Sequence, residues 1–427
     1  MAGRGTDEAS TVSMGRIAVA GFIGTTIEFF DFYAYGIAAA LVLNAAFFPT
    51  LDPVAGTLAA FSTNAVAFVS RPLGSALFGH WGDRLGRKSM LIASLLTMGL
   101  ATAAVGLLPG YATIGVAAPV LLVVLRFVQG IGLGGEWGGA ALLAAEHAPP
   151  GKRGLYTMFP QLGPAIGFIA ANGVFLLLAA LVDDASFAAW GWRVPFLASA
   201  LLVAVGLWVR LGVAESPVFA RAEKTRVPLV ELLRSQPREL LLGAGAMIVQ
   251  YALFYTATTY CLSYGTRVLG IARTEMLLLT MIAVVFLGVA TALSARASDR
   301  FGRKRVVLSG CAAGIVWGPA MFALLDTAEP VLVVLALGGA LAIMGLSFGP
   351  MAAFLPELFA TRTRYSGASI AYSLGGVLGG AVPPLVATSL EGGFGGIAIG
   401  LYLSLMAVIS LLSVLALTET RDRDLAG

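Results

Sequence analysis

The chain has 427 residues, of which 58% are hydrophobic and only 12% are charged, and its mean hydropathy is +0.88. A soluble domain usually carries about a quarter charged residues, so this composition excludes a water-soluble fold. The pI near 9.1 does not indicate nucleic-acid binding, because the basic residues form short clusters between apolar stretches. Those stretches have about the 20-residue length of a membrane-spanning helix. The composition therefore predicts an all-α polytopic membrane protein.

The predicted membrane helices are apolar windows separated by Gly, Pro and charged residues. The first window is not a cleaved signal peptide, because it carries Glu28 and Asp31 and lacks a small-residue cleavage site. In chain order, twelve transmembrane helices are expected at residues 17–47, 55–79, 89–108, 117–145, 155–181, 192–211, 239–265, 272–295, 305–325, 330–353, 365–390 and 396–418.

The distribution of basic residues predicts the orientation of these helices. If both termini are cytoplasmic, the outward loops hold only Arg193, Arg267 and Arg273. Arg71 and Arg126 lie within helices, which leaves 22 of the 27 Lys and Arg residues on the cytoplasmic side. This asymmetry follows the positive-inside rule, and the opposite orientation would violate it. We therefore expect a multi-pass protein in the lipid of the inner membrane, with both termini in the cytoplasm.

A polar stretch near the middle of the chain divides the predicted helices into two sets of six. The expected parts are a cytoplasmic tail at 1–16, an N-terminal six-helix bundle at 17–213, a cytoplasmic linker at 214–238, a C-terminal six-helix bundle at 239–418 and a cytoplasmic tail at 419–427.

An internal repeat relates the two bundles. The sequence DRLGRK at residues 83–88 recurs as DRFGRK at residues 299–304. A second echo follows each copy, since Glu146, Arg153 and Gly163 are matched by Glu357, Arg364 and Gly375. Two repeated six-helix halves are typical of transporters whose substrate site lies between the halves near the membrane midplane.

Several motifs resemble those of a known transporter family. Residues 79–88, GHWGDRLGRK, resemble the cytoplasmic loop motif of the major facilitator superfamily. Residues 126–132, RFVQGIG, resemble the motif of its fourth helix, whose arginine has been linked to proton movement. Four phrases resemble more specifically the metabolite:proton symporters, at residues 25–32, 71–74, 132–139 and 357–367.

This resemblance implies the major facilitator fold and proton-coupled uptake of a small carboxylate-bearing metabolite by alternating access. Permeases for mono-, di- and tricarboxylic acids, such as shikimate, 2-oxoglutarate and citrate, belong to the metabolite:proton symporters. Symporters of zwitterions such as proline and betaine belong there too, so a zwitterionic substrate is the alternative, and exchange or export is another. We expect no enzymatic activity, no cofactor or metal beyond the coupling proton, and a functional monomer.

One departure from the family pattern falls in the first predicted helix. A Glu-Trp-Tyr-Asp phrase typical of the family reads Glu28-Phe29-Phe30-Asp31 in this chain. The loss of two polar groups on the rings would alter substrate selectivity, unless both rings face lipid.

Charged residues inside the predicted helices are candidate transport residues. A charge at the bilayer centre costs roughly 2.5 to 3.5 kcal/mol, so such residues usually face a cavity and a partner. Asp31 lies three residues after Glu28, with Tyr35 one turn further, and two such carboxylates cannot both ionise cheaply. We expect Asp31 to bind the coupling proton with the help of Glu28; the alternative is that both pair permanently with arginines. The candidates, all in the N-terminal half, are Glu28, Asp31, Arg71, Arg126 and Glu136.

Arg126 is the predicted centre of the transport cycle. Its planar guanidinium suits a carboxylate, and Gln129 shares its helix face. A substrate carboxylate that competes for Arg126 with Asp31 or Glu28 would leave the displaced carboxylate free to bind a proton. Glu136, deeper toward the cytoplasm, is a further candidate for proton coupling. Arg71 is expected to be either a second anion contact or a structural anchor.

The seventh predicted helix supplies neutral polar candidates for substrate binding. Gln250 belongs to this set, and Tyr251, Tyr255 and Thr259 repeat every four residues, which predicts a polar stripe on one helix face. Tyr372 is a weaker candidate from the eleventh helix. The alternative is that the tyrosines pack between helices and the threonine bonds its own backbone.

The charged clusters at the cytoplasmic helix ends are predicted to form a gate. Acidic residues there can accept hydrogen bonds from helix amides and pair with guanidinium groups; the alternative is that the charges only fix topology. The predicted gate residues are Asp83, Arg84, Arg87, Glu146, Arg153, Glu215, Asp299, Arg300, Arg303, Glu357 and Arg364.

Overall fold

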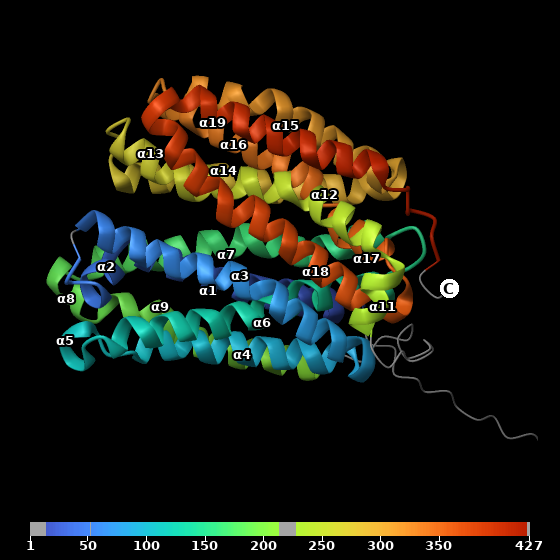
Figure 1. Cartoon of the computed structure of the whole chain (residues 1–427), viewed down its shortest axis with the longest axis horizontal. Coiled ribbons are helices and arrows are strands. Elements are labelled where there is room, and N and C mark those ends of the chain that lie inside the picture. Colours follow the sequence, from blue (N-terminus) through green and yellow to red (C-terminus); the bar gives the residue numbers. More distant parts are fainter. Residues whose placement is uncertain (1–13, 52, 213–227, 425–427) are drawn as a thin grey trace, which may run out of the picture.

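The regular elements of the computed structural model are all helices in the residues it describes, 14–51, 53–212 and 228–424. The long helices run side by side along the longest axis of the molecule (Figure 1). The all-α fold class predicted from composition is therefore confirmed.

The helices of the first half follow the predicted windows in order. They are α1 (Met14–Ala38), the π-helical turn η1 (Ala39–Leu43), α2 (Asn44–Phe47), α3 (Pro53–Leu85), α4 (Arg87–Leu107), α5 (Tyr111–Ile114), α6 (Ala117–His147), α7 (Arg153–Leu181), α8 (Asp184–Ala189), the 3-10 turn η2 (Gly191–Arg193) and α9 (Val194–Leu211).

The helices of the second half are interrupted more often. They are α11 (Pro228–Ser235), α12 (Pro237–Tyr255), the π-helical turn η3 (Thr256–Tyr260), α13 (Cys261–Arg267), α14 (Arg273–Phe301), α15 (Arg303–Leu325), α16 (Pro330–Phe348), α17 (Met351–Glu357), the 3-10 turn η4 (Thr361–Thr363), α18 (Arg364–Gly376), the π-helical turn η5 (Val377–Ala381) and α19 (Val382–Ala416).

Eleven helical segments of the described residues are long and apolar enough to cross a membrane. The remaining predicted window, 55–79, corresponds to α3, a helix of 33 residues that also carries polar and charged side chains. The predicted break between residues 390 and 396 is a kink inside α19, where Gly395 has a φ of 72°. All twelve predicted helices thus have a counterpart in the structure.

Two predicted helix ends need correction. We expected helices to end near residues 79 and 295, with the repeated motif in the following loops. Instead α3 continues to Leu85 and α14 to Phe301. The chain turns only at Gly86 (φ 119°) and Gly302 (φ 98°), conformations that glycine adopts without steric cost. Polar side chains do not stop a helix that has left the membrane, so the loss of hydropathy misplaced both ends.

Helix α6 lies at the centre of the first set of helices because its glycines permit close approach. A Cβ at Gly130 or Gly134 would collide with the backbone of α3, and one at Gly132 would lie 2.6 Å from the backbone N of Met98 in α4. Real Cβ atoms do not approach neighbours this closely, so larger residues would push the helices apart. The side chains of α6 are therefore held between α3, α4 and the other half of the molecule.

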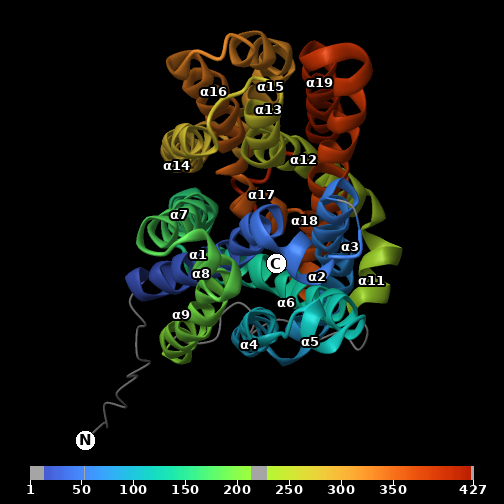
Figure 2. The ribbon, with the colours of Figure 1, turned by 90° about the vertical axis from the view of Figure 1, so that its left-hand side faces the viewer.

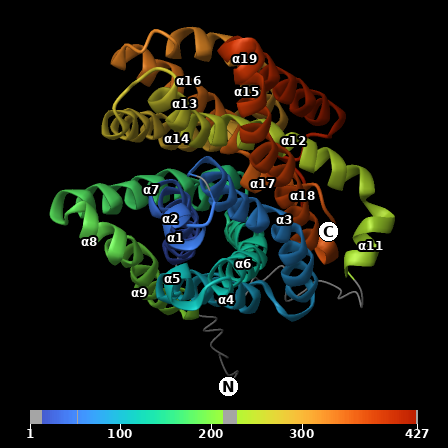
Figure 3. The ribbon, with the colours of Figure 1, turned by 60° about the vertical axis from the view of Figure 1, so that its left-hand side comes forward.

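The helices group into two packs with a shared interface. Figures 2 and 3 show α1 to α9 on one side and α12 to α16 with α19 on the other. Across the interface α7 packs against α14, and α18 packs against α3. The predicted linker, 214–238, contains α11, and its part up to residue 227 lies outside the described residues. The end of the molecule where α3 meets α4 and α14 meets α15 is named the gate end.

Candidate functional site

A narrow central cavity lies between the two packs of helices. Most of its wall is aromatic. The lining residues are Phe29 and Tyr33 of α1, Pro164 of α7, Met247, Gln250, Tyr251, Phe254 and Tyr255 of α12, Met344 and Phe348 of α16, and Tyr372 of α18. Both halves contribute to this wall, so a molecule held here would contact both.

Several polar atoms at this cavity have no hydrogen-bond partner among the described residues. They are the hydroxyl groups of Tyr33 and Tyr255 and both amide atoms of Gln250, all buried. Buried polar groups in folded proteins are normally hydrogen-bonded. A polar molecule in the cavity would satisfy these atoms, which makes the cavity the best candidate for the substrate site.

The structure brings together four of the five neutral residues predicted in the seventh and eleventh helices, whereas the predicted Tyr35 and Gln129 do not line the cavity. Gln250, Tyr251, Tyr255 and Tyr372 all line the cavity, but Thr259 is exposed and does not. The stripe prediction assumed a regular α-helix, whereas Thr259 lies in the π-helical turn η3. The four-residue spacing of an α-helix does not hold in a π-helical turn, and the Thr259 side chain is exposed outside the cavity. Phe29 also lines the cavity and does not face lipid.

Contacts between the two packs close the cavity toward the gate end. The rings of Trp137 and Tyr372 stack with centroids 3.9 Å apart and planes 6° apart. Trp137 donates to Gln161 Oε1 at 2.7 Å, and Gln161 Nε2 donates to the carbonyl of Phe348 at 2.7 Å. Because α6 and α7 belong to one pack and α16 and α18 to the other, the Trp137–Tyr372 stack and the hydrogen bond from Gln161 to Phe348 must break if the cavity opens at this end.

Arg71 and Glu28 form a buried ion pair beside the cavity. The Arg71 guanidinium carbon lies 5.5 Å from the centroid of the Tyr372 ring, which is part of the cavity wall. Arg71 Nε and Glu28 Oε2 have no hydrogen-bond partner among the described residues. The pair therefore has an unused donor and an unused acceptor, and another carboxylate could compete with Glu28 for Arg71.

Asp31 has a different partner from Glu28. It is fully buried and accepts a hydrogen bond from Ser199 Oγ of α9 at 2.8 Å. We expected the two carboxylates of α1 to act together. Residues three apart in an α-helix point in directions that differ by about 60° around the helix axis, so the two carboxylates meet different neighbours. Glu28 faces α3 and Asp31 faces α9, so the geometry gives no direct sharing of a proton between them.

Arg126 is held by neutral side chains. It donates to Gln129 and to Asn64, and its guanidinium carbon lies 3.7 Å from the centroid of the Tyr35 ring. No carboxylate of the described residues lies within ion-pair distance of Arg126, although Asp31 is close enough to interact electrostatically. The direct pairing of Arg126 with Asp31 or Glu28 that we expected is thus not present in this arrangement.

Glu136 is paired with Arg210, which was not among the predicted site residues. Arg210 Nη1 donates to Glu136 Oε2 at 3.0 Å, a second ion-pair contact joins Arg210 Nη2 to Glu136 Oε1, and Ser94 Oγ donates at 3.0 Å. Both charged side chains are buried. Glu136 is therefore fully compensated, unlike Asp31.

At the gate end, each copy of the repeated motif caps a helix of the opposite half. Asp83 accepts from the backbone N–H of Tyr365 at 3.2 Å and of Ser366 at 3.0 Å, in the first turn of α18. Asp299 accepts from the N–H of Gly154 at 2.8 Å and of Leu155 at 2.9 Å, in the first turn of α7. The first N–H groups of a helix have no partner within the helix and attract negative charge. The two carboxylates thus join the halves by the same chemistry.

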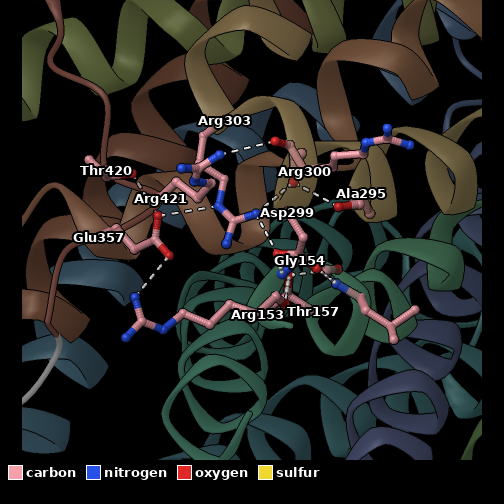
Figure 4. Close-up of polar contacts among 12 residues, drawn as sticks. Arg153, Gly154, Thr157, Ala295, Asp299, Arg300, Arg303, Glu357, Thr420 and Arg421 are labelled. Atoms are coloured by element: carbon pink, nitrogen blue, oxygen red, sulfur yellow. Dashed lines mark hydrogen bonds and ion pairs between the residues drawn. The ribbon is translucent and has the colours of Figure 1, made fainter. Parts of the chain in front are cut away.

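Two buried glutamates add ion pairs across the same interface. Glu146 of α6 lies 3.4 Å from Arg87 and 3.6 Å from Arg364 of α18. Glu357 of α17 lies 3.4 Å from Arg303 and 3.4 Å from Arg153 of α7 (Figure 4). Each glutamate therefore holds one arginine of its own half and one of the other, and the gate end is closed.

The last described residues join the gate cluster around Glu357. Thr420 Oγ1 donates to Glu357 Oε2 at 2.6 Å, and Arg423 Nη1 donates to the carbonyl of Glu357 at 2.8 Å. Arg153 donates to the carbonyl of Arg423 at 2.6 Å. Glu419 accepts from the first N–H groups of α15 at 3.0 and 3.1 Å. Residues 417–424, named the C-terminal strap, therefore connect α15, α17 and α7.

Comparison with known proteins identifies the family of this chain. Residues 21–384 match the Major Facilitator Superfamily. The chain belongs to this superfamily. The inner membrane metabolite transport protein YhjE of Escherichia coli K12 is 50% identical over 97% of this chain and 96% of its own length. The shikimate transporter of the same organism is 38% identical over 95% of both chains.

A solved structure supports the same major facilitator fold. The proton:xylose symporter XylE bound to 6-bromo-6-deoxy-D-glucose has a TM-score of 0.80 and 20% identity, with 97% of this chain and 98% of that chain covered. The resemblance to the major facilitator superfamily and its metabolite symporters is confirmed. The protein is thus a polytopic membrane transporter of metabolites and not an enzyme.

Two predicted gate residues, Arg84 and Arg300, stand apart from the ion pairs. Arg84 and Arg300 lie over the rings of Trp81 and Phe301, at 5.2 and 5.3 Å from the centroids, and do not contribute to the ion pairs of the described gate. Glu215 lies outside the described residues. Among the described residues, the gate chemistry therefore rests on the other eight predicted residues.

Several residues that bind the buried charged side chains were not predicted from the sequence. Asn64, Ser94, Ser199 and Arg210 each hold a buried charged side chain. Single Ser or Asn residues in an apolar window give no sequence signal. Arg210 does, because it continues the buried stripe of α9 at Pro195, Ser199, Val203 and Gly206 with helical spacing.

Proposed function

We propose that this protein takes up a small carboxylate-bearing metabolite in symport with protons, across the inner membrane, by alternating access. The gate end is the cytoplasmic end in this proposal, since most of the basic residues then lie on that side. The halves at 17–213 and 239–418 would rock against each other, joined by the linker at 214–238. No cofactor takes part besides the proton, and the proposed working unit is one chain in its lipid.

The observation that carries the carboxylate assignment is the Arg71–Glu28 pair beside the aromatic cavity. A substrate carboxylate would displace Glu28 from Arg71, whose planar fork suits it. The unpaired atoms of Gln250, Tyr33 and Tyr255 would bind the remaining polar groups of the substrate. The cavity is narrow in this closed arrangement, so the proposed substrate is a small metabolite.

The observation that supports proton coupling is the state of Asp31. It is buried without an ion pair, and an isolated carboxylate is costly to keep ionised in a medium of low dielectric. Arg126 lies near enough to stabilise the ionised form without neutralising it by direct contact. In the proposed cycle Asp31 binds the proton from outside, substrate engages Arg71, the gate end opens, and both are released.

The decisive experiment is uptake of labelled organic acids and zwitterions into proteoliposomes, with and without an inwardly directed proton gradient. We expect a carboxylate to accumulate only with the gradient. Asp31→Asn should no longer accumulate substrate against its gradient but should still let substrate move down its own gradient. If substrate accumulates equally without the proton gradient, or if Asp31→Asn still accumulates substrate, symport through Asp31 is refuted.

A zwitterionic substrate is the second candidate, and the aromatic wall favours it. The rings of Tyr251 and Tyr255 lie parallel at a centroid distance of 6.2 Å, next to Phe254 and Tyr372. Aromatic faces attract quaternary ammonium groups. Competition distinguishes the two candidates: an excess of betaine should leave carboxylate uptake unchanged under the leading proposal and should inhibit uptake under this one.

A further inference from the structure

The side chain of Ser199 is the one donor that the described structure gives to the Asp31 carboxylate. The Oγ–Oδ2 distance is 2.8 Å, and both residues are completely buried. Asp31 Oδ1 has no hydrogen-bond partner among the described residues. The two carboxylate oxygens are therefore unequal, because Oδ2 is held and Oδ1 is available for a proton.

The Thr102 hydroxyl of α4 also lies near Asp31 but does not replace Ser199 as a donor. Its single proton is directed at the carbonyl of Met98 at 3.0 Å, and its oxygen accepts from Gln129 Nε2 at 2.9 Å. With its proton directed there, Thr102 does not donate to Asp31. Ser199 is therefore the side chain that donates to Asp31 at hydrogen-bond distance in the described structure.

The charged and titratable groups on the other elements around Asp31 leave this role to Ser199. Arg126 of α6 is the charged group that acts on Asp31, and Arg71 of α3 is paired with Glu28. The titratable residues of α7, Arg153 and Tyr156, lie in its first turn at the gate end. From α9, Arg210 is bound to Glu136.

We propose that Ser199 is a positioning residue that fixes the Asp31 carboxylate through Oδ2 and thereby sets the pH range over which the transporter couples to protons. This inference rests on the proposed function, because it assumes that Asp31 carries the coupling proton. It also gives α9 a role beyond packing: one buried stripe of this helix presents Ser199 to Asp31 and, eleven residues later, Arg210 to Glu136.

The test is the pH profile of gradient-driven uptake by Ser199→Ala. A hydrogen bond to an ionised group favours that form, so its loss favours the protonated carboxyl. The pH at which uptake falls to half its maximum should move to higher pH by about one unit, a tenfold change that one hydrogen bond to a charged group supplies. Ser199→Thr keeps the hydroxyl and should restore the original midpoint.

Two control variants separate this inference from other causes. Ser347→Ala removes an equally buried hydroxyl that bonds only its own helix, at 3.0 Å from the carbonyl of Met344, and should leave the midpoint unchanged. If Asp31→Asn abolishes gradient-driven accumulation while Ser199→Ala keeps the wild-type midpoint, the role of Ser199 is refuted and symport stands. If Asp31→Asn accumulates substrate normally, the proposed function fails and this inference fails with it.

Discussion

The side chain of Arg71 has two roles that can be separated by substitution. Arg71→Gln should abolish uptake and lower the free energy of unfolding by about 3 to 5 kcal/mol, because it leaves Glu28 buried without its cation. The double variant Glu28→Gln with Arg71→Gln should recover most of that stability and still fail to transport. Thermal unfolding in detergent and proteoliposome uptake measure the two effects. Uptake by the double variant would contradict the assignment of Arg71 to the substrate.

The amide of Gln250 should matter for binding and not for folding. Neither of its polar atoms has a partner in the described structure, so Gln250→Leu removes a desolvation cost and should preserve or raise thermal stability. The KM for substrate should rise about tenfold, the effect of one lost hydrogen bond of ~1.4 kcal/mol.

Thr259 supplies the matched control for this prediction. It is exposed outside the cavity, so Thr259→Ala should leave both KM and stability unchanged. An equal rise of KM in the two variants would mean that the Gln250 effect is not local to the cavity.

A site residue could be predicted from the sequence when its residue type is rare in a membrane helix. Charged residues stand out against an apolar background, and the five predicted inside the helices are all buried. Their partners do not stand out, because Ser199 and Asn64 resemble any other small polar residue. Pairing was also unpredictable, since a shift of 60° around α1 decides whether a carboxylate meets Arg71 or Ser199.

At the scale of elements, periodicity predicted where helices lie but not where their geometry changes. Twelve windows gave twelve helices, yet the π-helical turn η3 displaced Thr259 from the predicted stripe. Nothing in TATTY distinguishes a π-helical turn from an α-helical one, because tertiary packing decides between them. The motif at 83–88 shows the opposite case: its repetition at 299–304 indicated a paired function, and both aspartates cap a helix of the other half.

These two helix caps should contribute equally to gate closure. Asp83→Asn and Asp299→Asn each remove a charge from the N-terminus of α18 or α7, which should weaken the closed gate by about 1 kcal/mol, a fivefold shift in population. A cysteine at Ser369 reports this shift, because Ser369 is buried behind the gate and its hydroxyl has no partner in the described structure. Its rate of alkylation from the gate end should rise about fivefold in each variant.

The comparison of the two caps requires a protein without other reactive cysteines and a matched control variant. Cys261 and Cys311 are both buried and would be replaced by Ala so that only Ser369→Cys reacts. Arg84→Gln, at a gate residue that lies over Trp81, should leave the alkylation rate unchanged. A change in one aspartate variant without a change in the other would show that the repeat is not functionally symmetric.

At the scale of the whole molecule, the two halves repeat the same gate but carry different chemistry. The charges buried between the gate and the far end, from Glu28 to Arg210, belong to the N-terminal half in the described structure. The C-terminal half contributes tyrosines and Gln250 to the cavity. The sequence indicated that the buried charges belong to the N-terminal half, because charged residues stand out in apolar windows. The C-terminal strap was not predicted, since its contacts use backbone carbonyls and hydroxyls of a short polar tail.

The strap should make the gate cluster around Glu357 harder to open than the cluster around Glu146. Thr420→Val together with Arg423→Ala removes side-chain hydrogen bonds of 2.6 and 2.8 Å to residue 357. At about 1 kcal/mol each, their loss should favour the open gate about 30-fold and raise the alkylation rate of Ser369→Cys accordingly. Asp422→Ala is the control: hydrogen bonding from Arg421 lowers the pKa of Asp422, but both side chains are exposed and such pairs contribute little. An alkylation rate that does not differ between the double variant and this control would mean that the strap follows the gate without holding it.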